Sequence, residues 1–487
     1  MRRSTGLRAG AGGKKRPAAR ARNRLALAPA SKKLNPFVHA VRQNDPILPL
    51  ELLMPAVRLS RLFAALACLC LPAAAAADAD YVPTTSVAET RAQFEKLPSD
   101  DIWWTVNGES MRWNNLNLQK FVPTVTVYRD GPVRDLEVAT NPAIGAFEVE
   151  TPNGPMTFDQ FLASDAATTM AVMILHEGKI VYENYPRQQP HDKPLFWSVT
   201  KAYVATVLAI LEDRGEVDVS LAIDHYIPKL KGSAYEGVPV RDVLDMASGV
   251  DCGDSYDSWE SCYYRYSSSI GEGHRPPGSA DNPYDYIASL SPEQRWAEPG
   301  VGYNYSGVDT FVIGWLVETI TGMPFQDALT REVWRHIGAE ADAVIWAGRY
   351  GIPLTSGGLM STVRDMGRFG LLFTPSRAVV SDKEIISQRY LDTILNGGRG
   401  SLMENTAWGN VRPDYLRHNV YQWDAVYTND DFMKAGWAGQ GLMINPRKDL
   451  VAVWTGYYDE EGSNISVLPM IRAIWAGLWP DAGDRTE

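Results

Sequence analysis

The stretch Ser198-Val-Thr-Lys201 has the residue types and the spacing of a nucleophile and its base, and it is the only S-x-x-K in the chain. Residues three positions apart share one face of a helix, so the lysine ammonium can reach the serine hydroxyl. Burial disfavours the charged ammonium and lowers the pKa of a lysine, which suits a base that works near neutral pH. The pattern therefore predicts a serine that becomes acylated and a lysine that takes its proton.

The surroundings of this tetrapeptide strengthen the prediction. About one chance match to S-x-x-K is expected in a chain of this length, so the four letters alone are weak evidence. An apolar run predicts a buried helix that opens at Ser198, reaches Arg214 and stops at Gly215. The start of this helix would add a positive field and free N–H groups beside the serine. The alternative is a serine that only caps the helix and a lysine that points to solvent.

Strands are expected on both sides of this helix. Residues 171–176 and 179–182 are strand-like runs joined by the hairpin signal Glu177-Gly178. Two more strands are expected at 437–444 and 450–454, near the end of the chain. This order predicts an α+β fold in which N- and C-terminal strands build one antiparallel sheet, flanked by helices and with an inserted helical region.

The helical region between the strands has its own signals. Helices are expected at 241–246, from an Asp309 cap to Thr321, and at 325–336, with a last one at 467–478. Residues 250–298 have little periodicity and many Tyr, Ser, Gly and Pro residues. Long irregular segments in compact enzymes often line binding sites, so we expect this one to do so.

The first 77 residues are interpreted as a leader and a signal peptide. Residues 1–53 are basic and rich in alanine, and we interpret Met54 as the true start of translation. Residues 54–77 combine arginines, a short apolar run and small residues, which predicts a secretory signal cleaved before Asp78. The mature protein is then periplasmic or secreted, without a membrane span. A lipid anchor at Cys68 or an uncleaved anchor is the less favoured alternative.

The charge of the mature chain restricts its partners. Removal of residues 1–77, which hold 14 basic and 2 acidic residues, leaves 33 Lys and Arg, 56 Asp and Glu, and a net charge of −23. Nucleic acids bind basic patches, so no nucleic-acid partner is expected. Residues 78–155 are expected to form an N-terminal extension that packs on the main domain, residues 156–487.

Two cysteines, Cys252 and Cys262, remain in the mature chain. An oxidising compartment would allow them to form a disulfide, and two free buried thiols are the alternative. No other cysteine pair or histidine cluster makes a zinc site, so neither a metal nor a cofactor is expected.

Three motifs in order resemble the class C β-lactamase-related serine hydrolases, a superfamily that includes penicillin-recognising peptidases and esterases. They are Ser198-Val-Thr-Lys201, Glu298-Pro-Gly-Val-Gly-Tyr-Asn-Tyr-Ser306 and Lys434-Ala-Gly-Trp-Ala-Gly439, with Tyr305 and Lys434 placed 107 and 236 residues after Ser198. The resemblance covers residues 156–480, and the motif sequences are most similar to those of the 6-aminohexanoate-dimer hydrolase branch. It implies a β-lactamase/transpeptidase-like fold.

By this resemblance Tyr305 is the third catalytic residue, the tyrosine of the Y-x-N/S motif. A phenol near an ammonium has a lowered pKa and can relay a proton; the alternative for Tyr305 is a core aromatic residue. The last motif position is Gly307, where relatives carry Asn or Ser. A side chain that would help hold the lysine and the substrate amide is therefore absent, and Asn304 or Ser306 is the candidate to compensate.

The third motif implies substrate-binding roles for Lys434, Gly436 and Trp437. A glycine lets the substrate backbone approach the strand closely, and the Trp437 N–H would complete an oxyanion hole with the N–H of Ser198. Lys434 would offer a positive charge to an anionic or polar substrate end, and a solvated surface lysine is the alternative.

These residues together predict a secreted serine hydrolase that cleaves an amide or ester bond of a small molecule or peptide through a Ser198 acyl-enzyme. The chain has no G-x-S-x-G elbow and no H-E-x-x-H motif, which disfavours an α/β-hydrolase and a metalloprotease. A penicillin-recognising binding module, or a scaffold without turnover, remains the alternative function.

Overall fold

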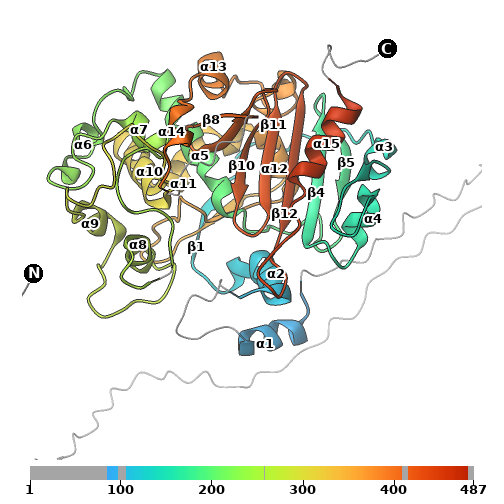
Figure 1. The fold of residues 1–487 in the computed structure, drawn as a ribbon, viewed down its shortest axis with the longest axis horizontal. Helices are drawn as coiled ribbons and strands as arrows, with labels where there is room; N and C mark the ends of the chain where they lie inside the picture. The colour runs from blue at the N-terminus through green and yellow to red at the C-terminus, as the bar shows by residue number, and fades with distance from the viewer. Residues whose placement is uncertain (1–84, 97–105, 257, 408–414, 481–487) are drawn as a thin grey trace, which may run out of the picture. The chain divides into compact units, whose positions relative to one another are not determined.

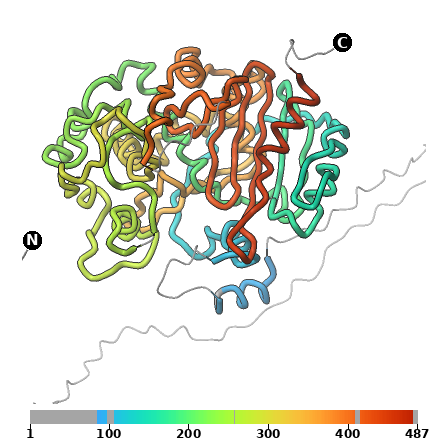
Figure 2. Tube along the Cα trace, viewed as in Figure 1, coloured from blue at the N-terminus to red at the C-terminus, as the bar shows by residue number. Residues whose placement is uncertain are grey.

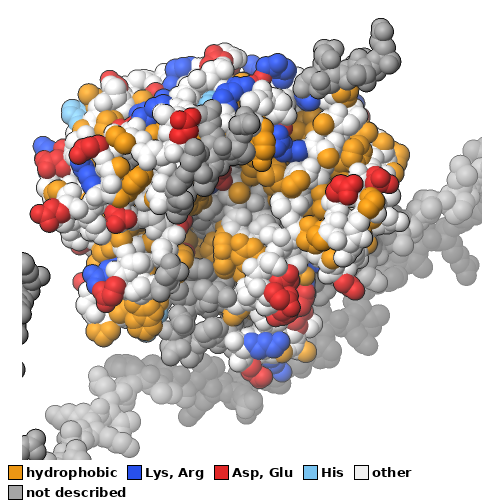
Figure 3. Space-filling view, in the orientation of Figure 1, with side chains coloured by type: hydrophobic (Ala, Val, Ile, Leu, Met, Phe, Trp, Pro, Cys, Tyr) orange, Lys and Arg blue, Asp and Glu red, His pale blue; other side chains and the backbone are white. Residues whose placement is uncertain are grey.

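The computed structural model describes residues 85–96, 106–256, 258–407 and 415–480. The predicted leader and signal peptide lie outside these residues. Within them, no helix is both long enough and apolar enough to cross a membrane. On the face drawn in Figure 3, Lys and Arg side chains are scattered among Asp and Glu side chains rather than gathered in one stripe.

A seven-stranded antiparallel sheet lies at the centre of the fold, in the order β5-β4-β12-β11-β10-β9-β8. Its strands are β4 (Thr169–His176), β5 (Lys179–Asn184), β8 (Leu416–Val420), β9 (Trp423–Tyr427), β10 (Phe432–Gly436), β11 (Gln440–Asn445) and β12 (Leu450–Gly456). Figures 1 and 2 show the early strand β4 running beside the last strand, β12. The predicted sheet built from both ends of the chain is confirmed.

Two hairpin turns of the sheet bear on the strand predictions. The β4–β5 hairpin turns at Glu177 and Gly178, with φ angles of +51° and +75°, as the sequence predicts. The β10–β11 hairpin turns at residues 437–439, where Ala438 and Gly439 have φ angles of +59° and +92°. The predicted strand at 437–444 is therefore wrong in its first three residues, because Trp437 and Ala438 carry no turn signal.

Helices cover both faces of the sheet. Successive side chains of a strand point to opposite faces, so the apolar side chains of β4 are buried under helices on both sides. Met173 and Leu175 of β4 lie in the larger buried cluster, together with helix α5 (Thr200–Asp213) and with α12 (Val363–Leu371), which packs on β4, β11 and β12. Val172 and Ile174 belong to a second buried cluster, with α4 (Phe158–Ala163) and α15 (Leu468–Leu478). The helix that carries Lys201 is thus buried on all sides.

The inserted helical region lies between β5 and β8. Besides α5 and α12, its helices are α6 (Ile223–Tyr226), α7 (Val240–Leu244), α8 (Cys262–Ile270), α9 (Pro283–Ala288), α10 (Gly307–Thr321), α11 (Phe325–Glu332), α13 (Gln388–Asn396) and α14 (Ser401–Glu404). Residues 250–298 are less irregular than expected, because the Tyr- and Ser-rich sequence of α8 hides its helical period. The cap of α10 is Ser306, which accepts the Asp309 N–H at 3.3 Å, and not Asp309 as predicted.

The residues before β4 pack on the same framework. They form α1 (Val87–Lys96), α2 (Gly108–Asn117), β1 (Thr124–Val127), α3 (Pro142–Gly145), β2 (Glu148–Val149) and β3 (Met156–Thr157). Strand β1 joins β6 (Ala343–Trp346) and β7 (Leu359–Met360) in a small sheet. Asn115 of α2 accepts a hydrogen bond from Trp197 Nε1 at 3.1 Å, so this segment supports the turn that carries Ser198.

Candidate active site

Ser198 lies in a short 3₁₀ turn, Trp197–Val199, that leads into α5. Trp197 has a φ of +47°, a left-handed conformation that is uncommon for a residue other than glycine. Lys201 follows in the first turn of α5 and is 1% exposed, and its Nζ donates a hydrogen bond to Ser198 Oγ at 3.0 Å. The alternative of a capping serine and a solvent-facing lysine is therefore wrong.

The surroundings of Lys201 favour its neutral form. Burial lowers the pKa of Lys201 to about 8, because the enclosed ammonium has lost most of its water. The carboxylates of Asp254, Asp424 and Glu272 act against this shift, whereas Lys434 adds to it. The Lys201 Nζ also donates to the backbone oxygen of Ser356 at 2.6 Å, which holds the amine in place. Lys201 can therefore take a proton near neutral pH.

Tyr305 reaches the same point from the segment before α10. Its ring centroid lies 5.0 Å from Lys201 Nζ and 4.7 Å from Lys434 Nζ. The expectation of a lowered pKa is wrong: burial raises the pKa of Tyr305 well above its ordinary value, and Asp424 and Asp254 add to the increase. A side-chain hydrogen bond with Ser198 acts in the opposite direction. Tyr305 is therefore a neutral phenol that carries its proton at neutral pH, and it is not a phenolate ready to act as the base.

Lys434 is fully buried in β10 and is already paired within the protein. Its Nζ forms an ion pair with Asp424 of β9 and donates to the Tyr305 hydroxyl at 3.0 Å. Asp424 also accepts the N–H of Ala435 at 2.9 Å. A solvated surface lysine is thus the wrong interpretation. The charge offered to an anionic substrate end is also largely balanced by Asp424, a residue that no sequence motif pointed to.

Gly436 ends β10 and lets this strand pass close to the serine turn. A Cβ atom at Gly436 would lie 2.3 Å from the backbone oxygen of Phe196, so only glycine fits there. The next residue, Trp437, packs edge-on against Trp197 with ring centroids 5.2 Å apart. The backbones of Trp437 and Ser198 are thereby brought to the same end of the site.

A cavity of about 610 Å³ joins these groups. Ser198, Lys201 and Tyr305 line it together with Gly436 and Trp437. Part of its wall comes from residues 250–298, as the sequence predicted, and the residues contributed are Asp254, Tyr256, Tyr263 and Glu272. Among the described residues, no group of three or more His, Cys, Asp and Glu side chains is placed to hold a metal ion.

Tyr263 of α8 explains why position 307 carries no side chain. A Cβ atom at Gly307 would lie 2.9 Å from the Tyr263 hydroxyl oxygen and 3.0 Å from its Cε2. Asn304 and Ser306, which were expected to compensate for the missing side chain, make hydrogen bonds elsewhere. Asn304 donates to Val250 O at 3.4 Å, and Ser306 donates to Cys252 O at 2.8 Å. Neither of them compensates for the missing motif side chain.

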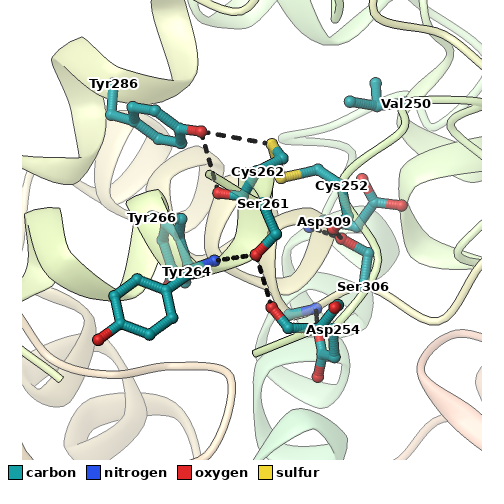
Figure 4. Close-up of a disulfide and its surroundings, with 12 residues drawn as sticks. Val250, Cys252, Asp254, Ser261, Cys262, Tyr264, Tyr266, Tyr286, Ser306 and Asp309 are labelled. Atoms are coloured by element: carbon teal, nitrogen blue, oxygen red, sulfur yellow. Dashed lines mark hydrogen bonds between the residues drawn. A yellow bond between two sulfur atoms is a disulfide. The ribbon is translucent and has the colours of Figure 1, made fainter. Parts of the chain in front are cut away.

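A disulfide between Cys252 and Cys262 closes the segment that carries Asp254 and Tyr256 (Figure 4). The two Cα atoms lie 5.1 Å apart. Ser261, next to Cys262, caps α8 by accepting the Tyr264 N–H at 3.2 Å and donates to Ser255 O at 2.9 Å. The cross-link therefore ties this part of the cavity wall to the start of α8.

The sequence model of the Beta-lactamase family matches residues 156–458. The chain belongs to the beta-lactamase family. This match accounts for the order of the three motifs and for the sheet topology described above. With the convergence of Ser198, Lys201 and Tyr305, it makes the chain a serine hydrolase of the beta-lactamase-related type.

Individual relatives of this beta-lactamase-family hydrolase include a 6-aminohexanoate-dimer hydrolase of Paenarthrobacter ureafaciens, 27% identical over 346 residues, which cover 70% of this chain and 84% of the relative. A beta-lactamase of Providencia stuartii is 32% identical over 89 residues, 17% of this chain and 23% of the relative. The solved structure of a putative 6-aminohexanoate-dimer hydrolase from Bacillus anthracis has a TM-score of 0.63 at 21% identity and covers 76% of this chain and 93% of its own. The Bacillus anthracis protein and this chain therefore share the same fold.

Proposed function

We propose that the mature chain is an exported hydrolase that cleaves an amide or ester bond through an acyl-enzyme on Ser198. The observation that carries this proposal is the 3.0 Å contact between Ser198 Oγ and the buried amine of Lys201, whose pKa lies near 8. A serine hydroxyl is unreactive until a base takes its proton, and this base is within reach of it.

Acylation then proceeds in two proton steps. Ser198 Oγ attacks the substrate carbonyl carbon while neutral Lys201 takes the hydroxyl proton, and the N–H groups of Ser198 and Trp437 stabilise the oxyanion. The leaving nitrogen or oxygen takes the phenolic proton of Tyr305, and the Lys201 ammonium returns a proton to the phenolate. A water molecule then attacks the acyl-enzyme and loses its proton to Lys201, and the Lys201 ammonium returns a proton to Ser198 Oγ as the ester bond to the serine breaks.

The substrate class is proposed from the cavity and from the relative. The relative acts, by its name, on a dimer of 6-aminohexanoate, and a cavity of about 610 Å³ is large enough for a small linear amide or ester. We propose a substrate of this class. A binding module without turnover is the competing function, favoured only by the absence of a side chain at Gly307.

The test is repeated turnover together with the site of labelling. The purified mature protein should hydrolyse many equivalents of a p-nitrophenyl ester, whereas a binding module would release at most one. Mass spectrometry after fluorophosphonate treatment should place the adduct on Ser198. Ser356→Ala is the matched control, because Ser356 also lines the cavity but contacts Lys201 through its backbone oxygen. An adduct on any other residue would end this mechanism.

Export is tested separately, on the protein from its native host. N-terminal sequencing should find Asp78 or a residue within a few positions of it. An intact Met1 in a cytoplasmic fraction would contradict export.

A further inference from the structure

Asp254 is held against the segment that carries Tyr305. Its backbone N–H donates to Tyr305 O at 3.1 Å, and its Oδ1 accepts the Gly307 N–H at 2.5 Å. These two bonds fix a carboxylate beside the motif position that has no side chain of its own. The disulfide at Cys252 holds the same segment from its other end.

The Asp254 carboxylate is open to the cavity. Its residue is exposed, it lines the cavity with Ser198 and Lys201, and none of the described residues donates a hydrogen bond to its Oδ2. The cavity itself is ringed by protein, and this loss of water raises the pKa of Asp254, whereas the charge of Lys201 lowers it. A substrate in the cavity therefore meets this carboxylate directly.

The charged groups around the cavity do not balance when Lys201 is ready to react. Lys434 is paired with Asp424, and Lys201 is neutral in the form that accepts a proton. Asp254 then remains on the wall without a partner cation within ion-pair distance among the described residues, and Glu272 lines the same wall. Glu272 accepts hydrogen bonds from Tyr256 and Ser267, at 2.8 and 2.7 Å, which hold its carboxylate in the wall.

We propose that Asp254 makes this active site select substrates by charge: neutral and cationic acyl groups are accepted, and acyl groups that bear a carboxylate are rejected. A like charge placed in an enclosed site is strongly unfavourable. The proposal deepens the function proposed above and rests on it.

The test uses three p-nitrophenyl esters with acyl chains of equal length. Their chains end in a methyl group, an ammonium or a carboxylate: the hexanoate, the 6-aminohexanoate and the adipate monoester. For the wild type, kcat/KM of the anionic ester should be at least about tenfold below that of the neutral ester. Asp254→Asn should raise the ratio of anionic to neutral rates by about tenfold, and Asp254→Glu should keep the wild-type ratio.

The controls separate charge from structure. Asp251→Asn makes the same change in net charge at an exposed residue outside the cavity and should leave the ratio unchanged. Glu272→Gln changes the same wall without touching the Gly307 contact and should raise the ratio by a smaller factor, even if Asp254→Asn does not fold. Equal loss on all three esters in Asp254→Asn, or equal wild-type rates on the neutral and anionic esters, would overturn the proposal.

The proposed hydrolase function would be refuted by a different result from the one that refutes charge selection. Release of one equivalent of nitrophenol without turnover would refute the hydrolase, while the acylation rates of the three esters would still decide the charge selection. Absence of any acylation would refute both.

Discussion

Lys434 Nζ donates a hydrogen bond to the Tyr305 hydroxyl oxygen at 3.0 Å, and this contact constrains where the phenol directs its own proton. The lysine can make this donation whether or not it is charged, so one side of the phenol oxygen is always occupied. The phenol O–H is then available on the side of Ser198 and the leaving group. Lys434 is in this arrangement a positioning residue for the acid, with Asp424 holding it from the next strand.

Tyr305→Phe should lower kcat by about 10²-fold for an amide substrate, because a poor leaving group needs the proton. For a p-nitrophenyl ester, whose leaving group departs as an anion, the loss should be much smaller. Steady-state rates on both substrates give the comparison. An equal loss on both would mean that Tyr305 does not act as the acid.

Ser198→Ala should abolish covalent labelling and leave the fold intact, because Ser198 makes no side-chain cap to α5. Lys201→Met, which keeps the aliphatic stem, should slow acylation by about 10³-fold or more. The double variant should be little slower than either single variant, since the two residues act as one unit. Stopped-flow acylation and thermal melts measure the two effects, and additive losses would contradict the shared role.

The rate should depend on pH through Lys201. Because acylation needs the neutral amine, kcat/KM for a neutral ester should rise as pH rises through about 8. Asp254→Asn removes a negative charge that raises the pKa of Lys201, so this rise should move to lower pH. Glu272, whose pKa burial raises to about 7, ionises in the same range, and Glu272→Gln should shift the rise in the same direction. A profile unchanged in both variants would speak against this coupling.

Reduction of the Cys252–Cys262 disulfide should destabilise the protein by about 2–3 kcal/mol, because the cross-linked residues are only 10 positions apart. It should also raise KM more than it lowers kcat, since the cross-link holds the cavity wall and not the nucleophile. Thermal melts and ester kinetics with and without a reductant are the measurement. The Cys252→Ser and Cys262→Ser double variant should no longer respond to the reductant; a response there would place the effect elsewhere.

Esterase activity should be measurable, and turnover of nitrocefin weak or absent. This β-lactam carries a carboxylate, and the lysine that would meet such a group is paired with Asp424, with Asp254 adding a like charge. The Asn or Ser side chain that relatives carry at the position of Gly307 is also absent. Parallel assays on one preparation compare the two substrates, and efficient, repeated nitrocefin hydrolysis would show this reasoning to be wrong.

The sequence predicted what depends on local pattern and on motif order. The Glu177-Gly178 hairpin, the buried helix behind Ser198 and the shared sheet follow from periodicity and turn chemistry, and all three are present. The pKa of Tyr305 and the pairing of Lys434 were predicted wrongly, because both depend on Asp424 and on burial across strands that are neighbours only in the fold. Asp254 and Tyr263 were missed for the same reason. Their segment was expected to line the site, but its sequence does not show which of its side chains point into the cavity.

The fit of Tyr263 against Gly307 restricts how this chain can change over evolutionary time. A single substitution of Gly307 by Asn or Ser would force its Cβ to within 3.0 Å of the tyrosine ring and hydroxyl. The smaller residue would have to appear at position 263 first, and that step alone would open the cavity wall beside Asp254. The route from this active site back to the common motif thus passes through a less well packed intermediate, and the order of the two substitutions is fixed by sterics.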